Sequence, residues 1–193
     1  MTPPKTLYLL AGCNGAGKTT AAYALLPTLL DCREFVNADE IARGLSPFRP
    51  ETVSIQAGRL MLARLRELLA AGESFALETT LATRIYLPLI AEARAQGYRV
   101  RLLFIWLNSP DLAVERVAAR VREGGHHIPE PVIRRRYEGG LRQFFAAYRT
   151  AADSWALVDN SNGTGLPVAN GEGGEMTVTN AIVWNQLIAN YHV

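Results

Sequence analysis

The chain has 193 residues, of which 49% are hydrophobic and 20% charged, and its net charge is +2 at pH 7. This length suits a single domain with one core, and the nearly balanced charge shows no footprint of a nucleic-acid-binding protein. No apolar run approaches the roughly 20 residues that a membrane span requires, and we expect no signal peptide because residues 1–5 lack a long apolar region. Cys13 and Cys32 are too few for a disulfide framework. We therefore expect a cytoplasmic protein with no nucleic-acid or membrane partner.

A strand, a glycine-rich loop and a helix are the first predicted elements. Residues 7–11 are a continuous apolar run, and residues 20–26 predict a helix that stops near Pro27. Between them, residues 12–19 fit the phosphate-binding pattern G-x-x-x-x-G-K-[ST] at every fixed position, and we call them the P-loop. Backbone N–H groups of such a loop surround phosphate oxygens, Lys18 reaches the outer phosphates, and the hydroxyl of Thr19 is a magnesium ligand. The expected nucleotide-binding residues are Gly12, Asn14, Gly15, Ala16, Gly17, Lys18, Thr19, Thr20 and Arg120.

The second predicted strand, residues 34–37, leads into an acidic segment. Asp39 lies just beyond this strand, where a carboxylate can accept the proton of a hydroxyl that attacks the terminal phosphate in line. An alternative is that Asp39 caps a helix beginning at residues 37–40. Residues 41–50 contain one glycine and two prolines, which predict a loop or a broken helix.

A helix at residues 52–71 and a third strand at residues 74–78 come next. The strand ends at Glu78, followed by Thr79 and Thr80. These side chains could hold substrate hydroxyls or, through water, the metal, and a solvated strand end is the alternative. A helix at residues 86–96 precedes the strongest strand signal, residues 98–107, whose nearly continuous apolar side chains are typical of a central parallel strand.

Residues 120–136 are expected to form an arginine-rich lid. A helix begins at Pro110, residues 123–129 form a glycine-containing loop, and a second helix covers residues 131–152. Arg116 and Arg120 lie one turn apart on the first of these helices. Such a lid could close arginine side chains onto a triphosphate.

Three consecutive arginines, residues 134–136, begin the second lid helix. They cannot all face the same way, and the apolar stripe of Ile133 and Tyr137 favours Arg134 and Arg136 for phosphate contacts. His126, in the lid loop, is expected to contact the substrate, because no third ligand is spaced to complete a metal site with the histidines.

The last predicted elements are a strand at 155–159, a flexible loop or exposed hairpin at 161–174, and a helix at 180–189. Alternating strands and helices predict an α/β three-layer sandwich with about five parallel strands and helices on both faces. We expect one domain, residues 1–193, in which residues 161–193 are peripheral. Ligands of such a sheet gather at the carboxyl ends of its strands, which should bring Asp39 and Glu78 close to the P-loop.

Among proteins with a P-loop, a small-molecule kinase fits best. A GTPase should carry an Asn-Lys-x-Asp motif on a later strand, and residues 159–162 read Asp-Asn-Ser-Asn instead. A motor or transporter ATPase should have an apolar strand that ends in a magnesium-binding aspartate, but the strongest strand here ends in Trp106-Leu107-Asn108.

Four blocks resemble the zeta toxin family of kinases. They are AGCNGAGKTT at 11–20, FVNADEIA at 35–42, SFALETTL at 74–81, and GGHHIPE with IRRRY across 124–137. The resemblance covers roughly residues 5–161 and implies a P-loop kinase fold with a lid. It also implies the toxin of a toxin–antitoxin pair, which uses ATP and Mg²⁺ to phosphorylate a hydroxyl of UDP-N-acetylglucosamine and pairs with an antitoxin protein.

Residue roles follow from this resemblance together with the positions above. The expected catalytic residues are Asp39 as the base, Lys18, Arg120, Arg134 and Arg136. The expected substrate-binding residues are Asp39, Glu78, Thr79, Thr80 and His126, and Thr19 is the expected metal ligand.

The chain resembles the short branch of the family, which lacks the longer C-terminal region that fuller toxins devote to the sugar nucleotide. The acceptor therefore stays open between UDP-N-acetylglucosamine and a related metabolite. Two other hypotheses remain: a non-toxic metabolic or salvage kinase on the same fold, and an ATP-binding interaction module without catalysis.

Overall fold

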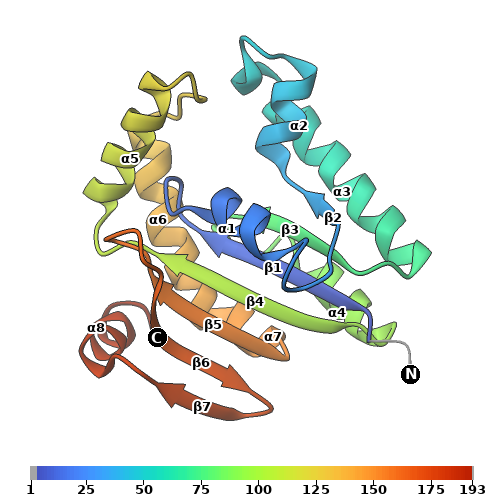
Figure 1. The fold of residues 1–193 in the computed structure, drawn as a ribbon, viewed down its shortest axis with the longest axis vertical. Helices are drawn as coiled ribbons and strands as arrows, with labels where there is room; N and C mark the ends of the chain where they lie inside the picture. The colour runs from blue at the N-terminus through green and yellow to red at the C-terminus, as the bar shows by residue number, and fades with distance from the viewer. Residues whose placement is uncertain (1–3, 193) are drawn as a thin grey trace.

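A computed structural model describes residues 4–192 as an α/β protein built on a seven-stranded sheet (Figure 1). The strands are β1 Thr6–Gly12, β2 Glu34–Val36, β3 Phe75–Thr79, β4 Arg99–Trp106, β5 Ser154–Asp159, β6 Leu166–Glu172 and β7 Glu175–Val178. The α-helices are α1 Lys18–Leu25, α2 Ala38–Leu45, α3 Ser54–Ala71, α4 Leu87–Ala95, α5 Pro110–Arg122, α6 Glu130–Gln143, α7 Arg149–Ala151 and α8 Ala181–Tyr191. A 3₁₀ turn, η1 Pro50–Val53, precedes α3, and a π-helical turn, η2 Phe144–Tyr148, joins α6 to α7.

The strand order is β2-β3-β1-β4-β5-β6-β7, and the first five strands are parallel. β1 lies inside the sheet and is apolar on both faces. Leu7 and Leu9 pack into a large core with α3, α4 and α6, whereas Leu10 packs on the opposite face with α1 (Figure 1). Full burial of each leucine contributes about 1.5–3 kcal/mol. The predicted sandwich with helices on both faces of a parallel sheet is confirmed.

The sheet is larger than the five strands expected from the sequence. β6 pairs antiparallel with β5 within the region expected to form a loop or exposed hairpin, and β7, just beyond that region, pairs antiparallel with β6. Gly173 and Gly174, both with positive φ, form the two-residue turn that joins these strands. Gly171 is also required, because a Cβ there would lie 2.5 Å from Nε1 of Trp155. The hairpin alternative is thus confirmed, although this hairpin extends the main sheet and its second strand lies beyond residue 174.

The C-terminal segment also contributes to the core, although it was expected to be peripheral. Val168 and Trp184 are 0% and 3% exposed. The Trp184 ring stacks on Trp155 with a centroid distance of 5.6 Å, and the guanidinium carbon of Arg149 lies 5.6 Å and 5.7 Å from the centroids of Trp155 and Trp184. This cation–π cluster fixes α8 against the sheet.

α2 covers residues 41–45 of the segment expected to be a loop or a broken helix, and the helix ends before residue 46. The helix begins directly after Asn37, whose Oδ1 accepts a hydrogen bond from the backbone N–H of Asp39 at 2.8 Å. Asn37 is therefore the N-cap, and the alternative in which Asp39 caps a helix is wrong. Gly44 is accommodated inside the helix, and Pro50 begins η1.

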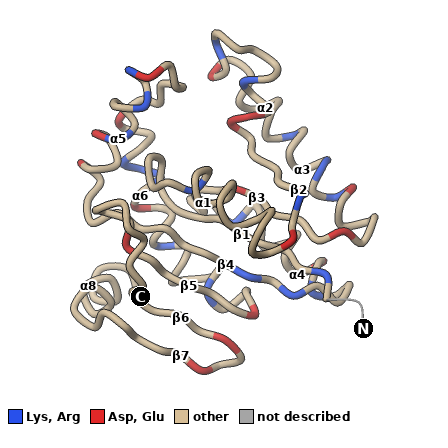
Figure 2. Tube along the Cα trace, in the orientation of Figure 1, with Lys and Arg blue, Asp and Glu red and all other residues tan. Residues whose placement is uncertain are grey.

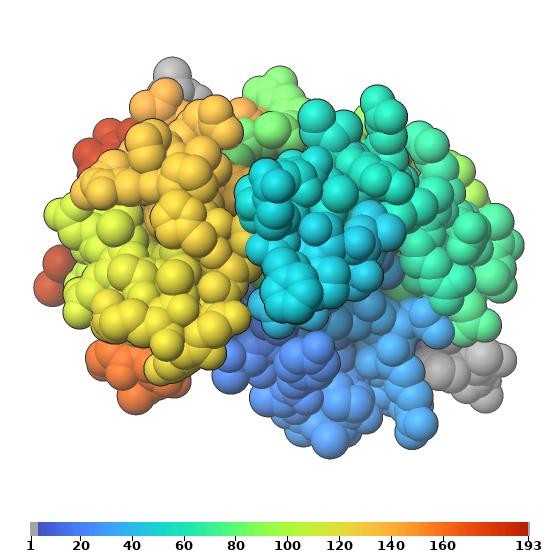
Figure 3. Space-filling view, turned by 90° about the horizontal axis from the view of Figure 1, so that it is seen from above, coloured from blue at the N-terminus to red at the C-terminus, as the bar shows by residue number. Residues whose placement is uncertain are grey.

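Two arms rise from the carboxyl edge of the parallel strands. One consists of α2, η1 and the start of α3, and the other of α5, the lid loop and the start of α6 (Figure 1). Seen from above, the arms lie side by side over the P-loop (Figure 3). Both arms carry basic residues (Figure 2). Within residues 4–192, no helix is long and apolar enough to cross a membrane.

Candidate active site

The P-loop forms an open cradle for an anion at the carboxyl end of β1. Gly12, Gly15 and Gly17 all have positive φ, and a Cβ on Gly12 would lie 2.2 Å from the carbonyl oxygen of Ile105. Gly17 is the N-cap of α1 and provides no side-chain hydrogen bond. The first N–H groups of α1 are therefore left for an incoming anion, which is the usual binding mode for phosphate at a helix N-terminus.

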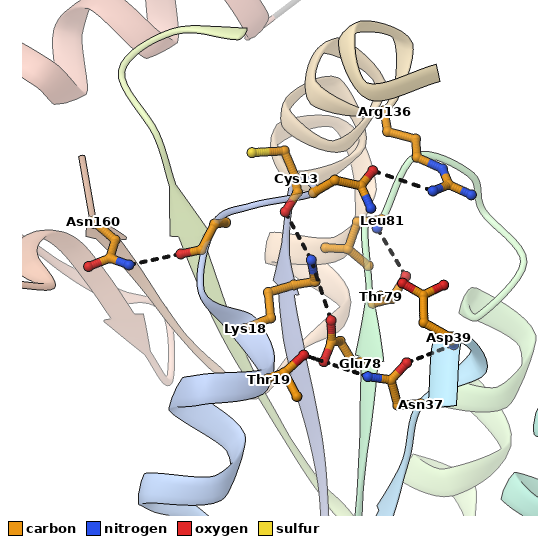
Figure 4. Close-up of polar contacts among 12 residues, drawn as sticks. Cys13, Lys18, Thr19, Asn37, Asp39, Glu78, Thr79, Leu81, Arg136 and Asn160 are labelled. Atoms are coloured by element: carbon orange, nitrogen blue, oxygen red, sulfur yellow. Dashed lines mark hydrogen bonds and ion pairs between the residues drawn. The ribbon is translucent and has the colours of Figure 1, made fainter. Parts of the chain in front are cut away.

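Asn160, which the sequence did not assign to the site, and Arg116, expected only as a lid arginine, brace the P-loop from outside. The side-chain amide of Asn160, which follows β5, donates to the carbonyl oxygen of Ala16 at 2.8 Å (Figure 4). Arg116 on α5 donates to the carbonyl oxygens of Asn160 and Ser161, each at 2.8 Å. The signal for Asn160 was its position at a strand end, and Arg116 stood out only as a neighbour of Arg120 by one helical turn.

Glu78 is the centre of a polar cluster below the P-loop (Figure 4). Lys18 is 6% exposed, donates from Nζ to the carbonyl oxygen of Cys13 at 2.9 Å, and lies 3.5 Å from Oε1 of Glu78. Oε2 of Glu78 accepts hydrogen bonds from the Thr19 hydroxyl at 2.7 Å and from Nδ2 of Asn37 at 2.9 Å. The structure thus brings Lys18, Thr19 and Glu78 together, and adds Asn37, which the sequence had placed only at a strand end.

The pair of Thr19 and Glu78 fits a magnesium ion. Their oxygens, 2.7 Å apart, lie at a separation that two neighbouring ligands of one small octahedral ion can adopt. Residues 4–192 contain no group of three or more His, Cys, Asp or Glu side chains that could hold a metal. A site with one or two protein oxygens is typical of magnesium that is bound mainly by phosphates and water.

Asp39 faces the P-loop from the other arm. Because Asn37 caps α2, the carboxylate of Asp39 is not needed for the cap, and it lines two cavities. One, of about 220 Å³, is shared with the P-loop, Thr20, Arg116 and Arg120. The other, of about 150 Å³, is shared with further residues of both arms and strand ends: Asn14, Lys18, Asn37, Ala38, Glu78, Thr79, Thr80, Tyr86 and Arg136.

Two lid arginines reach this site. Arg136 donates from Nη1 to Oδ1 of Asn14 at 3.3 Å (Figure 4). Arg120 donates from Nη2 to the carbonyl oxygen of His126 at 3.0 Å, while its buried Nε has no hydrogen-bond partner within residues 4–192. An unpaired buried guanidinium donor beside the P-loop is a natural contact for a phosphate oxygen.

Arg134, expected to contact phosphates, does not join them. Its guanidinium binds Asp111 at 2.6 Å and Glu130 at 2.8 Å, and its side chain is 41% exposed. The P-loop lies beside the flank of α6 that carries Arg136, and the acidic side chains hold Arg134 on the opposite flank. The expectation for Arg134 is thus corrected.

The lid loop and the α2 arm enclose a third cavity of about 500 Å³. Its lining includes Arg43, Phe48, His126 and His127. Burial lowers the pKa of His126, and the nearby Asp39 carboxylate opposes this shift. His126 lines this cavity and neither of the two cavities that Asp39 lines.

Cys13 brings no reactive group into the P-loop. Burial raises its pKa to about 11, so it remains a thiol at neutral pH. The hydroxyl of Thr79 accepts a hydrogen bond from the backbone N–H of Leu81 at 3.0 Å and keeps its own donor.

Comparisons with known proteins bear on the family and the fold of the chain. A family model described as "AAA domain" (AAA_33) matches residues 7–143. A relative named "Uncharacterized protein" from Haemophilus influenzae is 31% identical over 127 residues, which cover 65% of this chain and 88% of the relative.

Two solved assemblies share the fold at low identity. One is the AvrRxo1-ORF1:AvrRxo1-ORF2 complex, crystallised with sulphate ions (TM-score 0.77) and with ATP (TM-score 0.75); identity is 22%, and the match covers 95% of this chain. This chain spans only 63% of the matched AvrRxo1 chain. The other is the PezAT toxin–antitoxin system of Streptococcus pneumoniae, with 16% identity, a TM-score of 0.70, and coverage of 98% of this chain and 79% of that one.

Proposed function

The chain belongs to the AAA_33 family of AAA domains, and from this premise we propose that it is an ATP-dependent small-molecule kinase of the zeta toxin type. The observation that carries the proposal is the position of Asp39. Its carboxylate lines the cavity that contains the P-loop, Lys18 and Arg120, and also the adjoining cavity that contains Arg136. A module that only binds ATP needs the cavity at the P-loop alone, whereas a kinase also needs a base, such as the Asp39 carboxylate, beside that cavity.

The P-loop side would hold the donor nucleotide. Free N–H groups of α1 and the ammonium of Lys18 would bind the β- and γ-phosphates of ATP, and Arg120 and Arg136 would bind the transferring phosphoryl group. Thr19, with Glu78 beside it, would hold Mg²⁺, which neutralises phosphate charge when bound. Positioning and fixed positive charge would supply most of the rate enhancement.

The Asp39 side would hold the acceptor. As the acceptor oxygen forms its bond to the γ-phosphorus, its proton passes to the Asp39 carboxylate, and the bond from phosphorus to the β,γ-bridging oxygen breaks to release ADP. Deprotonation by such a base contributes typically 10²–10⁴-fold. The cavity lined by Arg43, Phe48 and His127 has room for the remainder of an acceptor larger than a simple alcohol.

We propose UDP-N-acetylglucosamine or a related metabolite as the acceptor, and an antitoxin as the protein partner in the cytoplasm. The sequence blocks shared with zeta toxins support this, as do the fold shared with the PezAT system and the AvrRxo1 complex with ATP. The identity of the acceptor depends on the resemblance more than on the cavity.

The test is transfer of labelled phosphate from ATP to UDP-N-acetylglucosamine and, in parallel, to a bacterial metabolite extract analysed by mass spectrometry. Asp39→Asn should retain ATP binding but lower transfer by about 10²–10⁴-fold, whereas Lys18→Ala should impair both. Glu40→Gln is the matched control on the same helical turn, since Glu40 is half-exposed and forms only a 3.8 Å contact with Arg43.

The outcomes separate the parts of the proposal. Full transfer by Asp39→Asn would show that Asp39 is not the base. Phosphorylation of another metabolite, with none of UDP-N-acetylglucosamine, would replace the acceptor and leave the kinase. ATP binding without transfer to any compound would support a binding module instead.

A further inference from the structure

Asn37 occupies a position that its role as a helix cap does not explain. It is 7% exposed, and both ends of its carboxamide are engaged. The oxygen accepts from the backbone N–H of Asp39 at 2.8 Å, while the amide nitrogen donates to Oε2 of Glu78 at 2.9 Å (Figure 4). A cap requires only an acceptor oxygen, which serine, threonine or aspartate would also supply.

The sheet brings Asn37 and Glu78 together. β2 and β3 are parallel, with Val36 opposite Leu77, so that the next residues of the two chains, Asn37 and Glu78, emerge side by side. On the other side of β3, Glu78 is opposite Leu10 of β1, just before the P-loop. The register of three strands therefore places the carboxamide between the two halves of the site.

Glu78 receives contacts from three side chains on two separate segments. Lys18 and Thr19 approach from the start of α1, and Asn37 from the cap of α2. Asn37 donates to the same oxygen, Oε2, that accepts from Thr19. Without the Asn37 donor, Oε2 of Glu78 would keep only its hydrogen bond with Thr19, and the orientation of the carboxylate would be less well fixed.

We infer that Asn37 is a positioning residue that couples the donor and acceptor halves of the site. It fixes the start of α2, which carries Asp39, and it holds the Glu78 carboxylate in the orientation that faces Thr19 and Lys18. This inference rests on the proposed function, in which Thr19 and Glu78 hold the metal of Mg·ATP. Partners of this kind, which orient a ligand without contacting the substrate, typically change metal affinity or activity by roughly 10–100-fold.

The experiment measures binding of a non-hydrolysable ATP analogue by calorimetry, with Mg²⁺ and separately with EDTA. Asn37→Ser keeps an oxygen for the cap but removes the amide donor, so its melting temperature should remain near that of the wild type. Binding of the magnesium-loaded analogue should weaken by roughly 10-fold or more. Binding in EDTA should be unchanged, because the P-loop N–H groups and Lys18 are intact.

Coupling through Glu78 is tested with a double-mutant cycle. If Asn37 acts through Glu78, then Asn37→Ser combined with Glu78→Gln should bind the magnesium-loaded analogue no more than about threefold worse than the weaker single variant. Asn180→Ser is the matched control, since Asn180 caps α8 with a single 3.2 Å hydrogen bond to Val183, far from the site. It should bind the analogue like the wild type.

Each result decides the inference. If Asn37→Ser weakened binding of the analogue equally with Mg²⁺ and with EDTA, or if the effects of Asn37→Ser and Glu78→Gln were additive, Asn37 would be only a helix cap and the inference would be overturned. Wild-type binding of the magnesium-loaded analogue by Asn37→Ser would overturn it as well. A wild type that binds the magnesium-loaded analogue and shows the coupling, yet transfers phosphate to no acceptor, would support Asn37 while refuting the proposed kinase activity. A wild type that does not bind the analogue would overturn both.

Discussion

Replacement of Arg136 by glutamine should lower kcat strongly while it changes the stability of the fold only slightly. Arg136 lies on the α6 flank beside the P-loop, where its guanidinium contacts Asn14 at 3.3 Å and lines the cavity that holds Asp39 and Glu78. That long hydrogen bond is worth about 0.5–1.5 kcal/mol to the fold. Loss of a fixed donor to transition-state charge costs more, about 2.7–4 kcal/mol, or 10²–10³ in kcat. We therefore expect a large fall in kcat with little loss of stability.

Arg134→Gln provides the matched control, two residues away on the same helix. Arg134 is bound to Asp111 and Glu130 on the surface, so its removal should leave kcat within about twofold of the wild type. The assay is initial-rate transfer of phosphate from ATP to the acceptor, with thermal unfolding of each variant measured alongside. If Arg134→Gln lost as much kcat as Arg136→Gln, or if Arg136→Gln kept half of the activity, the assignment of the phosphate contact to one flank of α6 would be refuted.

Two further predictions concern stability. Gly140→Ala should lower the free energy of unfolding by about 1–3 kcal/mol through overpacking, because its Cβ would lie 2.5 Å from the carbonyl oxygen of Thr80. Gly58→Ala should raise the free energy of unfolding by up to about 1 kcal/mol, because its Cβ would meet no atom within 4 Å. Equal effects of the two substitutions in urea titrations would contradict this reasoning. Burial raises the pKa of Tyr148 from 10.0 to about 12, so its contribution to stability is complete below pH 10 and is lost as the pH rises toward 12. Unfolding between pH 8 and 11.5 should therefore show a shallower alkaline decline in Tyr148→Phe than in Tyr23→Phe, whose ring is exposed.

The elements that the sequence predicted well depend on local signals. The parallel strands are apolar runs, the P-loop has a fixed glycine spacing, and the lid is marked by two helices that flank a glycine pair. β6 depends instead on pairing with β5, and β7 on pairing with β6, and the composition of residues 161–174 is typical of a loop. No local pattern shows that Gly171 gives room to the ring of Trp155.

The same distinction applies to the site. Asp39 and Glu78 could be predicted because both lie at carboxyl ends of strands, which meet at one edge of a parallel sheet. The bond between Asn37 and Glu78 joins residues 41 positions apart and requires the register of β2 on β3. Both Arg134 and Arg136 were expected to contact phosphates for a similar reason. Both flank the apolar stripe of α6, and only the packing of that helix decides which flank faces the P-loop.

The side chains around the site carry more positive charge than the net charge of the chain suggests, so composition could not reveal the site. The whole chain is nearly neutral, with a net charge of +2. Around the two cavities that share Asp39, however, four cationic side chains (Lys18, Arg116, Arg120 and Arg136) meet only two carboxylates, Asp39 and Glu78. The excess of positive charge is concentrated in a space of a few hundred cubic ångströms, where partial burial weakens screening by solvent. Glu78 already neutralises part of the charge of Lys18, so the excess that remains is suited to a nucleotide whose own charge is partly neutralised by Mg²⁺, rather than to a free triphosphate.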